Sequence, residues 1–193
     1  MMQQTLVVLK PDTVQRGLIG KILSRFEQVG LKMVACKLIL ATDELAQKHY
    51  PSTREEFIKG MGKKTLDNYK SLGIDPKKEL GTNDAHEIGK VIREWLVKYI
   101  SSGPAFAFVL EGPHAIDLVR KHCGDTLPVL AAPGTIRGDL TFDSSYLANS
   151  GKRPIKNLIH ASGTLEEAKY EIPLWFSSSE IYSYERVEEK AMR

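Results

Sequence analysis

The sequence has few cysteines, no long apolar run and almost no excess of one charge. Two cysteines, Cys36 and Cys123, among 193 residues cannot build the disulfide framework of a small secreted domain. The apolar runs, such as LVVL at 6–9 and AFAFVL at 105–110, have the length of strands and are too short to span a bilayer as helices. The MMQQ start does not resemble a signal peptide. These absences predict a cytoplasmic protein with reduced thiols and no membrane partner.

The charge balance argues against one further class of protein. With 27 basic and 24 acidic residues the net charge is only +3, which excludes a strongly basic nucleic-acid coat but leaves room for a local basic pocket. An apolar content of 42% and a charged content of 26% are those of a globular protein. A chain of this length buries its own core, so we predict a single domain over 1–193.

Strand-like and helical segments alternate along the chain. Apolar and β-branched runs predict strands at 5–9, 32–40, 105–110 and 157–161. Helical spacing and capping residues predict helices at 18–29, 42–49, 84–100 and 113–123, and another after Thr164. The order predicts an α+β, ferredoxin-like βαββαβ fold with a four-stranded antiparallel sheet. Extra helices on one sheet face and a long active-site loop at 127–154 complete this prediction.

The middle of the chain is harder to interpret. Thr53 and Glu56 have the spacing of a capping box and predict another helix start. The lysine-rich segment 63–80, interrupted by Gly73 and Pro76, predicts a surface excursion. Asn83 or Thr82 is the expected cap of the helix that follows. That helix has an apolar stripe including Trp95, which either packs on its own domain or forms a subunit contact.

Four groups that bind phosphate are predicted to surround one histidine. Lys10 ends the first strand and His160 lies on the last, and we expect these two strands to be neighbours at the middle of the sheet. Arg120, Thr126 and Arg137 lie before or within the long loop. Arginine binds phosphate oxygens as a fork and lysine as a point charge. The arrangement predicts a site where an imidazole meets an anion.

A neutral imidazole is also a nucleophile at cellular pH. It needs one ring nitrogen free and the other held by an acceptor, and either Glu171 or Ser162 is placed to hold the ring of His160. The plainer interpretation is that this histidine is solvated or only packed in the core, as single histidines usually are. We assign His49, His86, His114 and His122 to that ordinary class, and Phe57 is equally compatible with core packing.

The sequence resembles the nucleoside diphosphate kinase family over nearly its full length. The motifs that carry the resemblance are KPD at 10–12, QRGL at 15–18, HY at 49–50, SGP at 102–104, PGTIRGD at 133–139, NLIH at 157–160 and EIPLWF at 171–176. In that family the terminal phosphoryl group of a nucleoside triphosphate passes to a histidine and then to a nucleoside diphosphate. The resemblance therefore implies a phosphotransferase that works by a ping-pong mechanism through a phosphohistidine at His160.

The resemblance also implies a role for each residue of the site. Its catalytic residues would be His160, Lys10, Glu171, Ser162 and Tyr50, and its substrate-binding residues would be Lys10, Phe57, Arg120, Thr126, Arg137 and Asn157. Phe57 would stack on the base and Asn157 would contact the ribose. Mg²⁺ would be held by the substrate phosphates, with no metal ligand from the protein. The family is commonly hexameric, so we expect a homo-oligomer.

Three departures from the family pattern limit what the resemblance carries over. Gly163 stands where an acidic residue is usual after the histidine. Two insertions are predicted, one at 62–94 with its helix continuing to residue 100 and one at 140–156. The second insertion obscures which residue faces the base opposite Phe57.

Two rival functions remain open. One is a catalytically silent nucleotide-binding or regulatory module of the same fold. The other is single-stranded nucleic-acid binding, which the small net charge reduces to a side activity at most.

Overall fold

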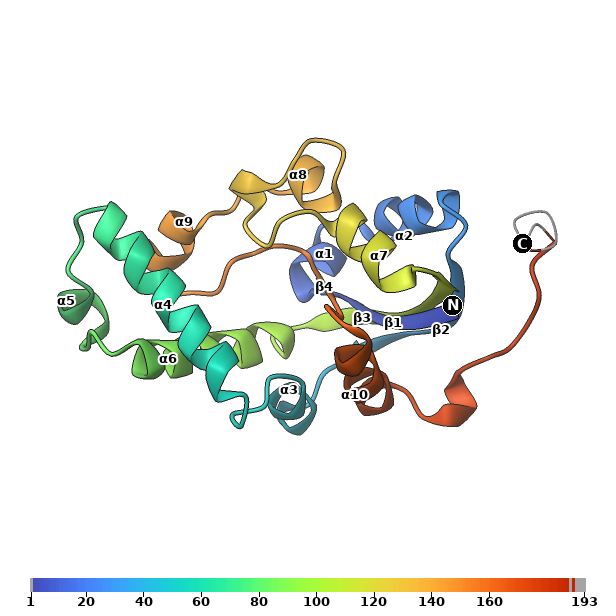
Figure 1. Ribbon diagram of the computed structural model, residues 1–193, viewed down its shortest axis with the longest axis horizontal. Coiled ribbons are helices and arrows are strands. Elements are labelled where there is room, and N and C mark those ends of the chain that lie inside the picture. The colour runs from blue at the N-terminus through green and yellow to red at the C-terminus, as the bar shows by residue number, and fades with distance from the viewer. Residues whose placement is uncertain (1, 188, 190–193) are drawn as a thin grey trace.

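The sheet of the computed structural model, which describes residues 2–187 and 189, has four antiparallel strands in the order β2-β3-β1-β4. The strands are β1 (Met2–Leu9), β2 (Lys32–Leu40), β3 (Pro104–Pro113) and β4 (Ile159–Ala161) (Figure 1). This confirms the predicted α+β, ferredoxin-like arrangement. Strands β1 and β4 are neighbours as expected, but β4 forms an edge of the sheet, whereas β3 and β1 occupy its centre.

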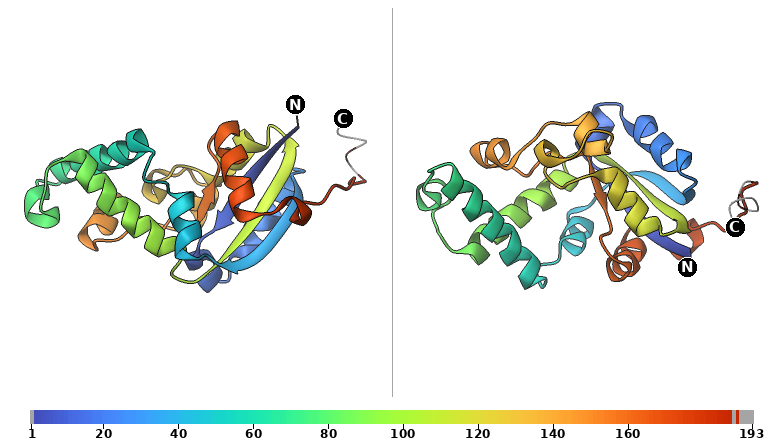
Figure 2. Two further views of the ribbon diagram at one scale, coloured as in Figure 1. Left: turned by 90° about the horizontal axis from the view of Figure 1, so that it is seen from below. Right: turned by 45° about the horizontal axis from the view of Figure 1, so that its top comes forward.

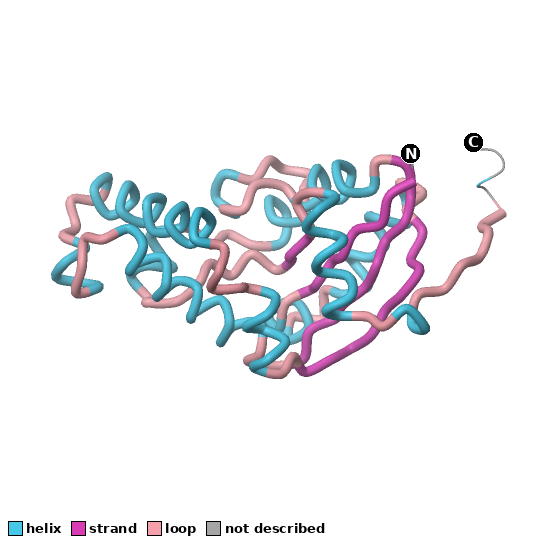
Figure 3. The backbone as a smooth tube through the Cα atoms, turned by 60° about the horizontal axis from the view of Figure 1, so that its bottom comes forward, coloured by secondary structure: helices cyan, strands magenta, loops and turns pink. Residues whose placement is uncertain are grey.

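Helices cover both faces of the sheet, so the expectation that they lie on one face is wrong. Leu6 and Val8 of β1 pack in a cluster with α3 (Asp43–His49), α6 (Ala85–Ile100) and α10 (Leu165–Trp175). The alternate residues Val7 and Leu9 pack with α2 (Ile19–Gln28) and α7 (Ala115–Cys123). Helices are seen on both faces of the sheet (Figures 2 and 3). The physical reason is visible in the sequence, because an unbroken apolar run such as LVVL buries both sides of a pleated strand.

Helix starts were predicted with mixed success. Thr42 caps α3 and Thr164 caps α10, each through its side-chain oxygen, as predicted. The capping box at Thr53 is wrong, since α4 (Glu55–Ser71) follows Arg54 without a side-chain cap. Asp84, rather than Asn83 or Thr82, caps α6. Helix α7 starts after His114, because Pro113 still belongs to β3.

The segment predicted as a surface excursion is mostly helical. Helix α4 continues to Ser71, and α5 (Pro76–Leu80) follows. Helices α4 and α6 approach closely where a Cβ atom on Gly62 would lie 1.7 Å from the carbonyl oxygen of Ala85. The lysines lie on the exposed side of this pair while Tyr69 is buried. We call α4, α5 and α6 the helical arm, which extends away from the sheet (Figure 1).

The long loop is also more ordered than predicted. It contains a 3₁₀ turn at Pro128–Leu130 and the short helices α8 (Ile136–Leu140) and α9 (Ser145–Ser150). Helix α9 packs on the helical arm, where Asn149 Nδ2 donates to Asn68 Oδ1 at 2.9 Å. The two predicted insertions therefore contact each other. Trp95 of the arm is half-buried and lines a hollow with residues 152–154 and 156.

One helix, one 3₁₀ turn and the segment that follows it complete the fold. Helix α1 (Pro11–Gln15) follows β1 directly, and a 3₁₀ turn at Ser178–Glu180 follows α10. The chain then runs along the β2 edge, where Tyr182 N donates to the carbonyl of Val34 at 2.8 Å. Among the described residues, every helix is too short or too polar to serve as a membrane span.

Candidate active site

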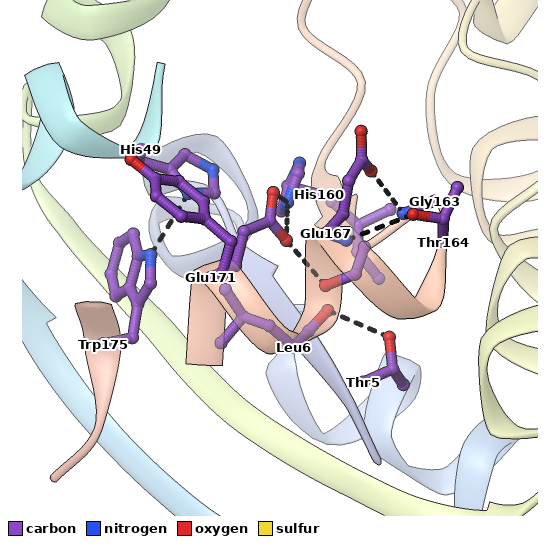
Figure 4. A network of polar contacts seen from close by, with 12 residues as sticks. Thr5, Leu6, His49, His160, Gly163, Thr164, Glu167, Glu171 and Trp175 are labelled. Atoms are coloured by element: carbon purple, nitrogen blue, oxygen red, sulfur yellow. Dashed lines mark hydrogen bonds and ion pairs between the residues drawn. The ribbon is translucent and has the colours of Figure 1, made fainter. Parts of the chain in front are cut away.

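Strand β4 places His160 beside the carboxylate of Glu171 from α10. Nε2 of His160 lies 3.0 Å from both Glu171 oxygens, and Ser162 Oγ donates to Oε2 of Glu171 at 2.6 Å (Figure 4). Both groups expected to orient the ring therefore do so, Glu171 directly and Ser162 through Glu171. Nδ1 of His160 has no hydrogen-bond partner among the described residues. The arrangement holds one ring nitrogen and leaves the other free.

Glu171 stays ionised at physiological pH. Burial alone would raise the pKa of its carboxyl, but the charge of His160 and the hydrogen bonds from His160 and Ser162 outweigh burial and lower the pKa to about 2. An ionised Glu171 can only accept a hydrogen bond, so the N–H of this contact lies on Nε2 of His160. Neutral His160 is thereby set in the tautomer whose lone pair is on Nδ1, which is the tautomer a nucleophile requires.

His49, which we assigned to the ordinary histidines, contacts the ring of His160. The two rings meet edge to face with their centroids 4.4 Å apart, and His49 is only 3% exposed. The indole N–H of Trp175 donates to Nδ1 of His49 at 3.2 Å, so neutral His49 has its proton on Nε2 (Figure 4). Nε2 of His49 has no hydrogen-bond partner among the described residues. The HY dipeptide was the only signal of this contact in the sequence.

His49, His160 and Glu171 are close enough to resemble a metal site, with ligand atoms within 4.8 Å of one another. Two imidazoles and one carboxylate are not the all-oxygen set that Mg²⁺ prefers. The proton that Trp175 keeps on Nε2 of His49 also removes the lone pair that a metal would need. Glu171 and His49 are better explained as a support for the ring of His160, Glu171 through hydrogen bonds and His49 through ring contact.

Burial of His49 makes stability depend on pH. Burial lowers the pKa of His49 well below its usual value, and the nearby His160 lowers it further. The side chain of His49 therefore becomes protonated near pH 6.5 in the unfolded chain but stays neutral in the folded chain. The free energy of unfolding consequently falls as the pH drops below about 6.5. We expect a loss of about 1 kcal/mol per pH unit between pH 6 and 5 from this group.

This dependence is measured by urea unfolding at pH 7.5, 6 and 5. His49→Asn should flatten the pH slope, whatever its effect on absolute stability. The matched control is His114→Asn at an exposed position where asparagine tolerates the positive φ of 53°. An identical slope in wild type and His49→Asn would contradict a buried neutral His49.

Lys10 and Asn157 are joined by a hydrogen bond next to β4. Lys10 Nζ donates to Asn157 Oδ1 at 2.6 Å, and Asn157 Nδ2 donates to the carbonyl of Thr126 at 2.9 Å. Burial of the ammonium group and the charge of Arg137 lower the pKa of Lys10 to about 7, although Asp12 opposes this shift. Lys10 is held next to β4, because its backbone N–H donates to the carbonyl of Leu158 at 2.8 Å. These contacts bring three of the predicted binding residues together.

The two predicted arginines lie in different environments. Arg137 is 3% exposed, and its guanidinium donates to the backbone carbonyls of Asn157, Gly124, Asp125 and Ile159 at 2.6–3.3 Å. It therefore holds the long loop against β4. Arg120 is exposed at the end of α7, and its guanidinium has no partner among the described residues. From the sequence, both arginines were predicted to bind phosphate, and the structural role of Arg137 was not predicted.

The aromatic residues of the predicted site lie on α3 and α4. Tyr50, which ends α3, packs its ring on His49 at a centroid distance of 4.7 Å. Burial, with a contribution from Glu171, raises the pKa of the Tyr50 hydroxyl. Phe57 of α4 is 42% exposed, and the guanidinium of Arg54 lies over its ring at 5.1 Å. An exposed ring here is consistent with a stacking platform rather than core packing.

Gly163 leaves room for a carboxylate from elsewhere. Its N–H donates to Glu167 Oε2 at 2.7 Å, and the other oxygen of Glu167 pairs with Arg54 at 2.6 Å. A Cβ atom on Gly163 would lie 2.9 Å from Glu167 Oε2. Glu167 thus brings a carboxylate to the backbone N–H of Gly163, a contact that the sequence alone did not indicate.

Comparison with known proteins identifies the family to which these groups belong. The family model described as nucleoside diphosphate kinase matches residues 3–63 and 79–181. The chain belongs to the nucleoside diphosphate kinase family. The interruption at 64–78 falls within the predicted insertion at 62–94 and indicates an insertion in the helical arm.

Relatives of known name agree over almost the whole chain. A nucleoside diphosphate kinase of Pyrobaculum aerophilum is 48% identical over 179 residues, which cover 93% of this chain and 97% of the relative. One of Borreliella burgdorferi is 40% identical over 189 residues, covering 98% and 96%. The family assignment therefore makes this protein an enzyme with nucleoside diphosphate kinase activity, a transferase that binds nucleotides.

Solved structures of the family share the fold. The NDP kinase of P. aerophilum superposes with a TM-score of 0.92 at 46% identity, covering 95% of this chain and 100% of that one. A transition-state mimic of the B. burgdorferi enzyme with vanadate and ADP has a TM-score of 0.78 at 40% identity, covering 98% and 96%. A Halobacterium salinarum kinase in complex with CDP has a TM-score of 0.69 at 33% identity, covering 100% and 99%.

Proposed function

We propose that this kinase works by a ping-pong mechanism in which Nδ1 of His160 is the phosphoryl acceptor. The observation that carries the proposal is the free Nδ1 of a ring whose Nε2 is held 3.0 Å from ionised Glu171. The Nδ1 lone pair forms a bond to the terminal phosphorus, and the bond from phosphorus to the bridging oxygen breaks, leaving the nucleoside diphosphate. A second diphosphate reverses these steps and takes the phosphoryl group. Transfer of labelled phosphate from ATP to GDP tests the proposal directly.

Phosphoryl transfer requires positioning and charge neutralisation more than covalent help from the protein. Lys10, Arg120 and Arg137 supply positive charge around His160, and Thr126 and Asn157 supply polar contacts to the phosphates and ribose. Mg²⁺, as part of the substrate complex, neutralises charge on the phosphates. The two imidazoles and one carboxylate near His160 are not a ligand set that suits Mg²⁺. This supports the proposal that phosphate oxygens hold the ion.

Lys10 should take up a proton when nucleotide binds. Because its pKa in the free protein is about 7, roughly half of the Lys10 side chains are neutral at pH 7. Phosphate oxygens favour the charged ammonium, so binding raises this pKa and draws a proton from the buffer. Calorimetry of ADP binding at pH 8 in buffers of different ionisation enthalpy measures the uptake.

The matched variant for this measurement is Lys10→Met. We expect wild type to take up most of one proton at pH 8 and Lys10→Met to take up clearly less. Equal uptake in both proteins would assign the proton to another group.

Base recognition should be broad. The structure places Phe57 as an exposed aromatic face, and stacking tolerates every base. The polar candidates for reading a base edge are already occupied, since Asp143 is bonded to Arg153 at 2.5 Å and Asn149 to Asn68 at 2.9 Å. We expect kcat/KM for ADP, GDP, CDP and UDP to lie within about a hundredfold of one another.

Steady-state assays of the four diphosphates against one triphosphate decide this point. Phe57→Ala should lower kcat/KM for all four by similar factors. A preference for one base by several orders of magnitude would require a polar reader that Asp143 and Asn149 do not provide.

The cellular location is inferred from the composition of the sequence, and the oligomeric state from the family resemblance. We propose a cytoplasmic homo-oligomer, with a hexamer as the expected state, and light scattering of the purified chain measures its mass. The silent-module alternative is disfavoured by the intact arrangement of His160, Glu171 and Ser162. Nucleic-acid binding is at most a side activity at a net charge of +3.

A further inference from the structure

Arg93 is a charged side chain buried in α6 of the helical arm. It is 7% exposed, and all three guanidinium nitrogens are hydrogen-bonded. Nε donates to the carbonyl oxygen of Tyr50 at 2.6 Å, Nη2 to Gln47 Oε1, and Nη1 to Glu94 Oε1 at 2.5 Å. A buried guanidinium is costly unless its partners satisfy it. Two of these partners belong to the last turn of α3 and its end.

The contact to Tyr50 fixes the point at which α3 ends. The last carbonyls of a helix have no donor within the helix, and Tyr50 is the residue that terminates α3. The guanidinium supplies the missing donor and places positive charge at the negative end of the helix dipole. Arg93 therefore sets the position of the last turn of α3 relative to α6.

That last turn carries the residues that pack on the reacting histidine. His49 is the final residue of α3. Its ring lies 4.4 Å from the ring of His160 and 4.7 Å from that of Tyr50, measured between centroids. Arg93 itself is not among the residues assigned to substrate. A displacement of the end of α3 would move the ring of His49, which is in direct contact with the ring of His160.

We propose that Arg93 is a positioning residue that couples the helical arm to His160 through the end of α3. The proposal rests on the proposed function, in which His160 accepts the phosphoryl group. Because an attacking atom must be aligned closely with its target, a misplacement of about 1 Å costs up to about a hundredfold in rate. The arm, which contains the predicted insertion, thereby helps to set the speed of the covalent step.

The test compares Arg93→Met with Lys90→Met. Arg93→Met keeps an apolar stem and removes the donors. Lys90 is exposed on the same helix, and Glu87 is its one salt-bridge partner among the described residues. At saturating Mg-ATP, we expect Arg93→Met to slow single-turnover phosphorylation of His160 by about tenfold or more. The Kd for ADP should change by less than about threefold. Lys90→Met should match wild type in both measurements.

Two further variants separate positioning from general packing. Arg93→Ala should recover part of its phosphorylation rate when millimolar guanidinium ion is added, because the small cation restores the donors. Gln47→Ala removes one of the three partners, so it should show a smaller loss of the same rate even if Arg93→Met does not fold.

Several results would overturn the proposal. One is a wild-type phosphorylation rate in Arg93→Met or, where that variant does not fold, in Gln47→Ala. Another is a parallel loss of rate and ADP affinity in Arg93→Met without guanidinium recovery in Arg93→Ala, which would leave Arg93 a packing role only. Failure of the proposed function is distinguishable from both, because wild type itself would then not be phosphorylated.

Discussion

Replacement of His160 by alanine is expected to abolish the phosphoenzyme and with it the transfer of phosphate between nucleotides. Wild type incubated with labelled Mg-ATP should form a phosphoprotein that is labile to acid, stable to base and chased onto added diphosphate. In His160→Ala no nitrogen occupies the position of Nδ1, so the label should fall to background. The expected loss of turnover exceeds about a thousandfold, because the covalent step has no substitute nucleophile.

The fold should survive this replacement, which makes the result interpretable. His160 is half-buried, and among the described residues its ring is hydrogen-bonded to Glu171 alone, which keeps its hydrogen bond from Ser162. His114→Asn is the control, since that histidine is exposed between β3 and α7. His49 is the one other described histidine in contact with His160, so label that persists in His160→Ala but disappears in the double variant with His49→Asn would move the nucleophile to His49.

Replacement of the two arginines is expected to separate catalysis from folding. Arg120→Ala should lower kcat/KM by the equivalent of about 2–4 kcal/mol, because a charge facing the phosphates is lost. Its stability should match wild type, since the guanidinium has no partner among the described residues. Assays of transfer and urea unfolding curves of the same protein measure both quantities.

Arg137→Ala should lose stability as well as activity. Four backbone carbonyls lose the guanidinium as a donor. That of Ile159 belongs to a buried residue next to His160, while that of Asn157 keeps the N–H of Ile159 at 2.7 Å. Each buried group left without a partner costs about 1–3 kcal/mol, so we expect the free energy of unfolding to fall by more than about 2 kcal/mol. Equal stability in Arg120→Ala and Arg137→Ala would contradict the structural role assigned to Arg137.

The extent to which the sequence predicted the site depends on the distance between partners along the chain. Lys10, Asn157, His160, Ser162 and Glu171 were identified because they lie in motifs that the sequence displays directly, and the structure brings them together. His49 was misassigned because its contacts, Trp175 and His160, are more than 100 residues away in sequence. No local pattern distinguishes a histidine that packs on a nucleophile from one that packs in a core.

The secondary structure shows the same division. Apolar runs predicted all four strands, and β2 was predicted with its observed bounds, because most residues of the segment 32–40 are apolar. The segment 63–80 was assigned to a surface excursion because it is lysine-rich and interrupted by Gly73 and Pro76. The helix that covers its first half is supported by the close approach of Gly62 to Ala85 and by the burial of Tyr69, which no local pattern displays.

By itself, the sequence determined the fold class, the identity of the reacting histidine as a hypothesis, and the groups proposed to bind phosphate and ribose. Each of these was predicted from residues close together in sequence, either from hydrophobic periodicity or from a contiguous motif. Only the tertiary structure decided that Arg137 donates to backbone carbonyls, that Glu167 accepts a hydrogen bond from the N–H of Gly163, and that Arg93 reaches the end of α3. These roles depend on hydrogen bonds between residues that are far apart in sequence. Such donors and acceptors meet only in the folded chain, where burial requires each of them to have a partner.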